Sequence, residues 1–244
     1  MAIAGTHLLV AGGSGALGGA IARAAARRGY VVGVHYYRHR ERANETASAC
    51  AAAGGRAVVV QGDLRLRNEA RRVLEDFEDA CGGVPRAVVC AVGGAKDEPV
   101  LRTSEDSFTS SVELNLTAPT WLLQAACNRW AECGGHAVVL GSFAGSVGRT
   151  GGAAYAAGKA GLVGLMRSVA REFGWRGVRV NIVVPPFVRQ GMGAAASDEF
   201  VRAETSRSLL GRTGDAESFA AFVMDVVAAK GITGQVISGD SRIA

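Results

Sequence analysis

Residues 7–29, HLLVAGGSGALGGAIARAAARRG, read as a short apolar strand, a glycine-rich turn and a helix. The strand is expected over His7 to Ala11, and the helix is expected to run to about Arg28, with Gly29 as its C-cap. Glycines between a strand and a helix let backbone N–H groups approach a phosphate, and the helix N-terminus favours negative charge. The stretch therefore predicts a phosphate-binding turn, with a glycine-rich loop that binds nothing as the alternative.

The alternation of strand and helix continues along the chain. Further strand-like apolar runs lie near residues 31–36, 57–61, 87–91, 136–141, 178–184 and 235–238, with helical stretches between them. This pattern predicts a parallel sheet covered by helices on both faces. Because the sequence shows no linker or low-complexity segment, residues 1–244 are expected to form one domain. The expected fold is a single Rossmann-type, doubly wound α/β sheet of about seven strands.

Composition narrows the classes of function. A hydrophobic fraction of 48% supports a sizeable core. The five cysteines contain no C-x-x-C pair and the four histidines form no cluster, so no metal site is expected. No signal peptide or membrane-spanning run is found, which predicts a cytoplasmic protein without a membrane partner. The net charge of +5 leaves nucleic-acid binding open, but no such motif is present and an anionic cofactor or acidic partner explains the charge equally well.

A phenol, an ammonium and a hydroxyl occur at a spacing that suits proton transfer. Tyr155 and Lys159 stand four residues apart in AAYAAGKAG, on one face of a helix, and Ser142 precedes them in VVLGSFAG. A nearby ammonium favours phenolate, so Lys159 is expected to lower the pKa of Tyr155 toward the range of a general acid. Such groups protonate a carbonyl oxygen while hydride reaches the carbon. Alone, Y-x-x-x-K is also common on ordinary helices.

The end of the second strand indicates which nicotinamide cofactor is bound. An NAD site places an acid near the ribose 2′-hydroxyl about 20 residues beyond the glycines. Here the stretch HYYRHR, from His35 to Arg40, contains no acid before Glu41. Arginine offers a bidentate contact to a 2′-phosphate. Arg38 and Arg40 therefore favour NADPH, with a basic helix start on a basic protein as the alternative.

Together these features resemble the short-chain dehydrogenase/reductase family over nearly the whole chain. More narrowly they are similar to the bacterial 3-oxoacyl-[acyl-carrier-protein] reductases. The stretch LLGRTGDAESFAAFVMDVV, followed by GITGQVISGD, is typical of that group. The resemblance implies that Ser142, Tyr155 and Lys159 are the catalytic serine, tyrosine and lysine. It also implies that Asn115, in VELNLTAP, helps hold a water that resupplies protons through Lys159. A purely structural role at a helix kink is the alternative for Asn115.

The resemblance further implies the residues that bind NADPH (NADP⁺). Asp63, in VVVQGDL, matches the family's aspartate near the adenine. The full set is Gly12, Ser14, Gly15, Leu17, Gly18, Tyr37, Arg38, Asp63, Leu64, Cys90, Ala91, Gly93, Tyr155, Lys159, Pro185 and Val188.

Several positions beside the expected cofactor differ from the family pattern. Ala11 and Ala16 replace the threonine and middle glycine of T-G-x-x-x-G-x-G, Cys90-Ala91-Val92-Gly93 replaces N-N-A-G, Pro186 replaces a glycine, and Gln190 replaces a threonine. These differences bear on the pose of the cofactor more than on the chemistry.

The implied function is NADPH-dependent reduction of a ketone to a secondary alcohol. The implied substrate is a 3-oxoacyl thioester on an acyl carrier protein, in fatty-acid or polyketide biosynthesis. Arg176, in FGWRGVRVN, matches a position where carrier reductases often keep an arginine for the acidic carrier; a solvated helix end is the alternative. A carrier-independent tailoring ketoreductase or alcohol dehydrogenase that acts on a free or aromatic polyketide ketone stays open, as does a non-catalytic NADP-binding regulatory protein.

Two further expectations concern mobility and assembly. Residues 189–211 are expected to form a mobile lid over the substrate, with Gly191 and Gly193 able to act as hinges.

The family pairs subunits through the helices that correspond to residues 119–132 and 152–173, so a homodimer or homotetramer is expected. The small residues of the second helix suit close packing of that kind.

Overall fold

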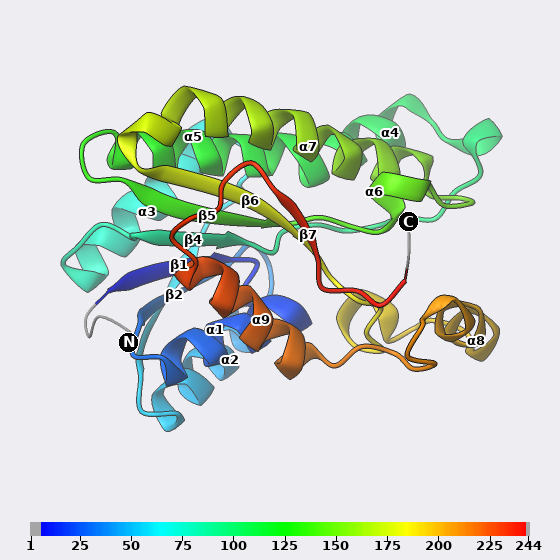
Figure 1. Ribbon diagram of the computed structural model, residues 1–244, viewed down its shortest axis with the longest axis horizontal. Coiled ribbons are helices and arrows are strands. Elements are labelled where there is room, and N and C mark those ends of the chain that lie inside the picture. The colour runs from blue at the N-terminus through cyan, green and yellow to red at the C-terminus, as the bar shows by residue number, and fades with distance from the viewer. Residues whose placement is uncertain (1–5, 243–244) are drawn as a thin grey trace.

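The computed structural model describes residues 6–242, and within them seven parallel strands form one sheet. The strand order is β3-β2-β1-β4-β5-β6-β7 (Figure 1). The strands are β1 (His7–Ala11), β2 (Val31–Tyr36), β3 (Arg56–Gln61), β4 (Ala87–Cys90), β5 (Gly135–Leu140), β6 (Val178–Val184) and β7 (Val236–Ser238). The predicted fold class and strand positions are confirmed, with strand ends that differ by one residue from the predicted ones.

Helices cover both faces of the sheet. In Figure 1, α3, α5 and α7 lie above the sheet and α1, α2 and α9 lie below it, and each group packs with its face of the strands into a separate hydrophobic core. The α-helices are α1 (Ala16–Arg27), α2 (Arg40–Ala52), α3 (Arg67–Cys81), α4 (Glu105–Val112), α5 (Ala118–Trp130), α6 (Ala144–Val147), α7 (Ala153–Phe173), α8 (Asp198–Arg207) and α9 (Ala216–Ala228). Four short turns complete the list: η1 (Val100–Arg102), the π-helical η2 (Glu113–Thr117), η3 (Gly174–Arg176) and η4 (Gly191–Gly193).

The first strand and helix show why the opening stretch folds as it does. Leu8 to Ala11 are fully buried because β1 lies between β2 and β4 and is covered on both faces. α1 ends at Arg27, is capped by Arg28 and is followed by Gly29 with φ of 84°, close to the predicted end. A Cβ at Gly18 would lie 2.2 Å from the carbonyl oxygen of Gly12, so only glycine lets α1 pack against its turn.

The strand order changes direction at β1, since β2 and β4 lie on opposite sides of it. In open parallel sheets such a switch point opens a crevice at the carboxyl ends of the strands, where ligands bind. Here α6, α8 and the loops after the strands surround that edge, at the right of Figure 1. The topology therefore predicts where the site lies before any side chain is considered.

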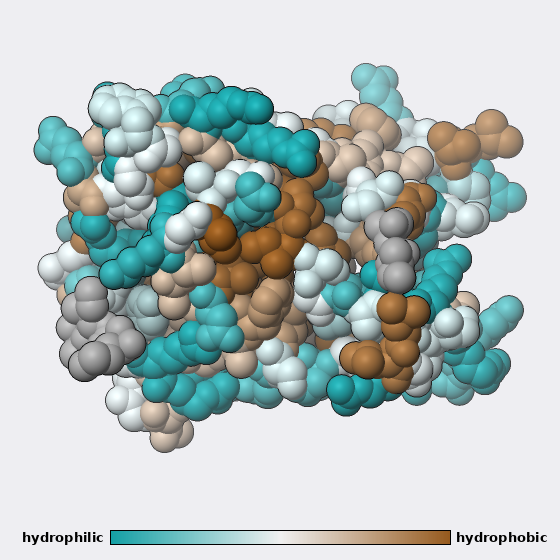
Figure 2. Space-filling model, viewed as in Figure 1, coloured by the Kyte–Doolittle hydropathy of each residue, from teal (hydrophilic) through white to brown (hydrophobic). Residues whose placement is uncertain are grey.

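Two surveys of the described residues bear on function. Among residues 6–242, no three His, Cys, Asp or Glu side chains lie together in a way that could hold a metal ion. No helix in the same range is long and apolar enough to cross a membrane. Figure 2 shows hydrophobic residues gathered around the short edge strand β7, on a face that is otherwise largely polar. The cytoplasmic setting stays a prediction.

Candidate active site

The catalytic side chains predicted from the sequence meet at the carboxyl edge of the sheet. Ser142 follows β5, and Tyr155 and Lys159 lie in the first two turns of α7. Tyr155 is 9% exposed and Lys159 is 5% exposed. Ser142 and Tyr155 line a cavity of about 600 Å³. The structure thus brings the hydroxyl and the phenol to one wall of a space large enough for a small substrate.

Lys159 is held by the backbone at the ends of two strands. Its Nζ donates to the carbonyl oxygen of Leu140 at 2.9 Å and to that of Val92 at 3.5 Å. Burial lowers the pKa of Lys159 to about 8, and the neighbouring Cys90 thiol acts weakly in the opposite direction. The amine therefore titrates close to neutral pH, where it can both hold and release a proton.

Asn115 lies in the π-helical turn η2, between α4 and α5, and is fully buried. Its Nδ2 donates to the carbonyl oxygens of Gly94 at 2.8 Å and Ser111 at 2.9 Å, and its Oδ1 accepts from the N–H of Gly94 at 3.2 Å. These bonds fix the loop after β4. A Cβ at Gly93 would lie 3.0 Å from Asn115 Oδ1 and 3.1 Å from Lys159 Nζ, so Gly93 permits the amide and the amine to lie close together.

A second cavity of about 360 Å³ lies beside the glycine turn, on the other side of the switch point. Nine of the residues predicted to bind the cofactor line it: Gly12, Ser14, Gly15, Tyr37, Arg38, Asp63, Leu64, Ala91 and Gly93. Eight further residues complete the lining: His35, Tyr36, His39, Gly62, Arg65, Val92, Leu114 and Ala118. None of these eight residues was among those predicted from the sequence to bind the cofactor.

The glycine turn has the features that a diphosphate needs. α1 begins after Gly15 without a side-chain cap and without an acidic residue in its first turn, so its N-terminal positive end is uncompensated. A Cβ at Gly12 would lie 3.0 Å from the backbone of Ala91, so glycine is needed for the close approach of the two loops. These residues fit the phosphates of a dinucleotide.

Two guanidinium groups flank Tyr37 at the far end of this cavity. The guanidinium carbons of Arg38 and Arg65 lie 5.0 and 5.4 Å from the Tyr37 ring centre. Arg65 also pairs with Asp63 at 2.6 Å, and this hydrogen bond holds the pKa of Asp63 below its usual range. Asp63 is therefore already paired with an arginine of the same protein. Arg65 was missed in the sequence, where its signal was a basic residue directly after Asp63-Leu64.

The comparisons with known proteins agree with this geometry. The family pattern described as "Enoyl-(Acyl carrier protein) reductase" matches residues 11–241. The chain belongs to the short-chain dehydrogenase/reductase family.

Members of the short-chain dehydrogenase/reductase family match the chain over nearly its whole length. A 3-oxoacyl-[acyl-carrier-protein] reductase of Rattus norvegicus is 32% identical over 234 residues, covering 96% of each chain. The 3-oxoacyl-[acyl-carrier-protein] reductase FabG of Staphylococcus aureus is 31% identical, covering 94% of each chain. A dehydrogenase/reductase structure from Sinorhizobium meliloti superposes with a TM-score of 0.92 at 31% identity, covering 99% of this chain and 96% of that one.

These relatives establish the reaction class. Short-chain dehydrogenase/reductases bind a nicotinamide cofactor, and the matched proteins are named as reductases and dehydrogenases. The chain is therefore an oxidoreductase that acts on C=O or CH–OH groups, a ketoreductase of this family.

The predicted direction of the pKa shift of Tyr155 is wrong. The ammonium of Lys159 was expected to lower the pKa of Tyr155, but burial raises the pKa of Tyr155 above its ordinary value of 10.0. The Ser142 hydroxyl and the Arg149 guanidinium act in the opposite direction without overcoming burial. Lys159 has no such effect here because its Nζ is turned to backbone carbonyls. The phenol is accordingly held in its protonated form.

Seven residues predicted to bind the cofactor do not line the second cavity, beside the glycine turn: Leu17, Gly18, Cys90, Tyr155, Lys159, Pro185 and Val188. Cys90 is 1% exposed and belongs to the core, and Val188 is also buried. Gly18 serves the contact between α1 and its turn. For these seven, contact with a cofactor stays a prediction. Arg40 begins α2, is exposed and does not line the cavity either.

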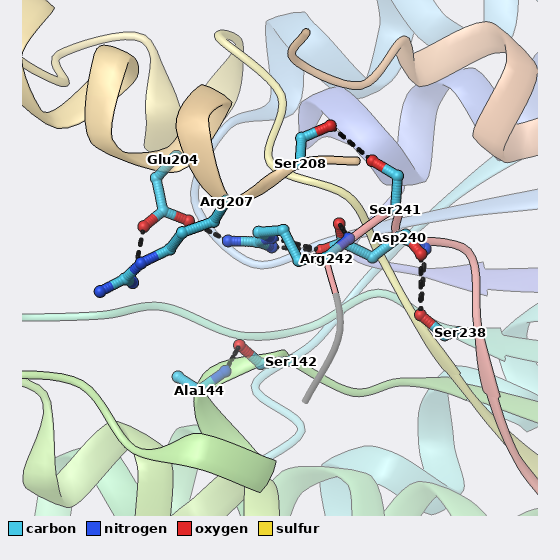
Figure 3. A network of polar contacts seen from close by, with 9 residues as sticks. All are labelled: Ser142, Ala144, Glu204, Arg207, Ser208, Ser238, Asp240, Ser241 and Arg242. Carbon is cyan, nitrogen blue, oxygen red and sulfur yellow. Dashed lines mark hydrogen bonds and ion pairs between the residues drawn. The ribbon is translucent and has the colours of Figure 1, made fainter. Parts of the chain in front are cut away.

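The predicted lid of residues 189–211 forms η4 and α8 and covers the substrate cavity. Gly191, with φ of 56°, backs onto Ala16, where an added Cβ would lie 3.0 Å from the alanine Cβ. Figure 3 shows a second attachment, in which Arg242 pairs with Glu204 of α8 and with Asp240. The Arg242 guanidinium also lies 4.4 Å from the ring centre of Phe143, next to Ser142.

This attachment was not foreseen from the sequence. Ser208, at the end of α8, lies 2.6 Å from Ser241 between hydroxyl oxygens (Figure 3), and the N–H of Leu209 donates to the carbonyl oxygen of Ser241 at 3.1 Å. Residues 240–242 therefore help to hold the lid over the cavity. Such a contact joins residues distant in sequence and leaves no local pattern.

Proposed function

We propose that this protein is an NADPH-dependent ketoreductase. The observation that carries the proposal is the position of Ser142 and Tyr155 on one wall of the 600 Å³ cavity, with Lys159 buried behind them. The cofactor cavity joins this arrangement through the loop after β4, which contacts Lys159 through the Val92 carbonyl. When bound, NADPH supplies the hydride that adds to the ketone carbon.

The protein's own groups then handle the oxygen and its proton. Tyr155 is kept as a neutral phenol by burial and donates its proton to the carbonyl oxygen. Ser142 hydrogen-bonds the same oxygen and stabilises the negative charge that develops on it. Lys159, with a pKa of about 8, holds a proton close to the site at neutral pH. Asn115 holds the loop that positions Lys159 and contributes to the resupply of protons.

The preference for NADPH is tested by Arg38→Asp, with Arg40→Asp as the matched control. Arg38 lines the cofactor cavity and Arg40 does not. A hydrogen bond to a charged group contributes about 1.5–3 kcal/mol, so Arg38→Asp is expected to lower kcat/KM for NADPH about 10- to 100-fold. Arg40→Asp should have a much smaller effect. Steady-state kinetics with NADPH and NADH measure both, and a wild-type preference for NADH would contradict the proposal.

We propose a 3-oxoacyl thioester on an acyl carrier as the first substrate to test. The rat and Staphylococcus aureus relatives, both named as 3-oxoacyl-[acyl-carrier-protein] reductases, support it. A carrier-independent ketone is a second candidate, because the cavity is lined by several charged side chains, which an apolar acyl chain does not need. Turnover of NADPH with an acetoacetyl thioester, a cyclic ketone and an aromatic polyketide ketone ranks these substrates.

Arg176 lies far from the site within one subunit. It belongs to η3, directly before β6, at the amino edge of the sheet, whereas Tyr155 lies at the carboxyl edge. Its guanidinium lies 4.5 Å from the ring centre of the exposed Trp175. A carrier that docks on Arg176 would therefore deliver its acyl chain to another subunit. We propose a homodimer or homotetramer through α5 and α7, in which this delivery is possible.

Arg176→Glu is expected to raise KM for a carrier-bound substrate and to weaken the salt dependence of kcat/KM, because an acidic carrier is steered by basic groups. Arg71→Glu, an exposed arginine on α3, is the charge-matched control. A free ketone should be reduced equally well by both variants. No change in KM for the carrier substrate would remove Arg176 as a docking residue. Light scattering in the same samples reports the mass, and a 25.1 kDa species alone would contradict delivery between subunits.

A further inference from the structure

Arg149 places a positive charge beside the proton donor. It lies in the short loop between α6 and α7, and it lines the same cavity as Ser142 and Tyr155. Its guanidinium carbon lies 5.8 Å from the centre of the Tyr155 ring. A substrate whose carbonyl oxygen meets the phenol would therefore place its neighbouring atoms within reach of this guanidinium.

The guanidinium of Arg149 has N–H groups without hydrogen-bond acceptors in the described part of the chain. Its Nη2 pairs with Oδ1 of Asp97, whose side chain is 61% exposed. Its Nε is buried and has no partner, and Asp97 is the one hydrogen-bonding partner that residues 6–242 offer to the guanidinium. A pair with so exposed a carboxylate is weak, and an unpaired buried donor is costly. The present pairing therefore leaves Arg149 with binding capacity for another acceptor.

The loop that carries Arg149 is nevertheless held in place. The N–H of Glu98 donates to the carbonyl oxygen of Gly151 at 2.7 Å, which joins residues 95–99 to residues 148–152. Gly151 has φ of 71°, a left-handed conformation that glycine adopts without strain. Asp97 and Arg149 are therefore presented to the cavity by two connected loops.

The other arginines that line this cavity are already paired with carboxylates. Arg242 directs Nη1 to Glu204 and both Nε and Nη2 to Asp240. Arg207 lies on α8, is 63% exposed and pairs with Glu204 at 3.3 Å. Among the described residues that line the cavity, Arg149 is thus the cation that combines closeness to Tyr155 with unused donors.

We propose that Arg149 binds a carboxylate of the substrate, so that the ketone reduced here is an oxo acid. The carboxylate lies a few bonds from the carbonyl and takes two N–H groups of the guanidinium, a geometry that arginine offers to planar anions. Asp97 competes for the same guanidinium and is displaced. This inference rests on the proposed ketone reduction and favours its carrier-independent candidate, because the carboxyl group of a 3-oxoacyl thioester is esterified and carries no charge.

The reaction leaves the carboxylate unchanged. With NADPH bound, its hydride would form the new C–H bond at the ketone carbon, the C=O π electrons would move to oxygen, and Tyr155 would protonate that oxygen. The products are the hydroxy acid and NADP⁺, and the phenolate regains one proton from solvent.

The test compares acetoacetate with methyl acetoacetate, which carry the same ketone with and without the charge. For the wild type, kcat/KM is expected to be about 10- to 100-fold higher for the acid, the value of a charged hydrogen bond. Arg149→Gln should lower this acid-to-ester ratio by a similar factor. Asp97→Asn should raise the ratio, because it removes the competing carboxylate. The two variants thus move the ratio in opposite directions.

Three outcomes overturn the inference. If Arg149→Gln lowers kcat/KM equally for acetoacetate and for methyl acetoacetate, the arginine acts only through Tyr155. A ratio that neither variant changes means that it contacts no carboxylate. Failure of acetoacetate to raise the Tm of the wild type, together with no turnover, excludes binding. If acetoacetate raises the Tm of the wild type but not of Arg149→Gln while neither probe is reduced, binding stands and the proposed ketone reduction fails.

Discussion

Tyr155→Phe is expected to lower kcat about 10²–10⁴-fold, because the variant keeps the ring and loses the proton that reaches the carbonyl oxygen. The ring occupies the wall of the substrate cavity, so the shape of the site should be preserved. Burial raises the pKa of Tyr155 above 10.0, so the wild-type phenol stays protonated through the neutral range. The rate of NADPH oxidation at saturating ketone measures the loss.

Binding and folding controls separate chemistry from damage. The cofactor should bind Tyr155→Phe with nearly unchanged affinity, because the cofactor cavity beside the glycine turn is built by other residues. Tyr30→Phe is the matched control, since Tyr30 packs beside the other core at the amino edge of the sheet. Turnover of Tyr155→Phe close to that of the wild type would exclude Tyr155 as the proton donor.

The second large effect is a loss of stability in mild acid, caused by two buried histidines. His35 accepts a hydrogen bond at Nδ1 from the Gly12 N–H at 3.1 Å, and its Nε2 lies 3.0 Å from the carbonyl oxygen of Gly62. His136 has Nδ1 3.0 Å from the Val227 carbonyl oxygen and Nε2 3.0 Å from Nδ2 of Asn181. Each ring is thus satisfied as a neutral imidazole with one donor and one acceptor.

Burial lowers the pKa of both His35 and His136 from 6.5 to about 4. Below pH 6.5 both imidazoles are therefore protonated in the unfolded chain, whereas in the folded protein they stay neutral until about pH 4. The free energy of unfolding falls as the pH falls from 6.5 to about 4. From pH 7.5 to pH 5 each histidine contributes a loss of about 2 kcal/mol, against a total stability of about 5–15 kcal/mol. Urea unfolding at the two pH values measures the sum.

NMR titration of the wild-type protein tests whether His35 and His136 cause this loss of stability. The imidazole signals of His35 and His136 should not shift between pH 7.5 and 5 in the folded protein. His39→Gln, at an exposed position, serves as the control and should leave the acid loss in place. Titration of either buried ring near pH 6.5 would contradict the prediction. Because His35 is bonded to Gly12 of the glycine turn, the NADPH affinity of the folded protein should also fall, but only as the pH approaches about 4.

Much of the fold follows from local patterns. Strands buried on both faces produce unbroken apolar runs, and glycines mark the turn after β1 and the end of α1, so strand positions were predicted to within one residue. The i,i+4 spacing of Tyr155 and Lys159 follows from helix geometry alone. Because parallel strands end at one edge, the residues after β1, β4 and β5 had to meet there.

Contacts between distant segments could not be predicted in this way. Arg65 beside Tyr37, Arg149 beside Tyr155 and Arg242 beside Phe143 each join loops that only the assembled sheet brings together. No periodicity or spacing records such pairs, because the partners lie on different elements.

The sequence by itself determined the strand–helix order, the glycine turn and the spacing of Ser142, Tyr155 and Lys159, to which the proposed proton transfer is assigned. Only the tertiary structure decided the electrostatics of the site. The spacing of Tyr155 and Lys159 predicted a lowered phenol pKa, whereas the structure raises it. The reason is that desolvation depends on all the atoms packed around a group, and the direction of Lys159 Nζ depends on carbonyls at the ends of β4 and β5.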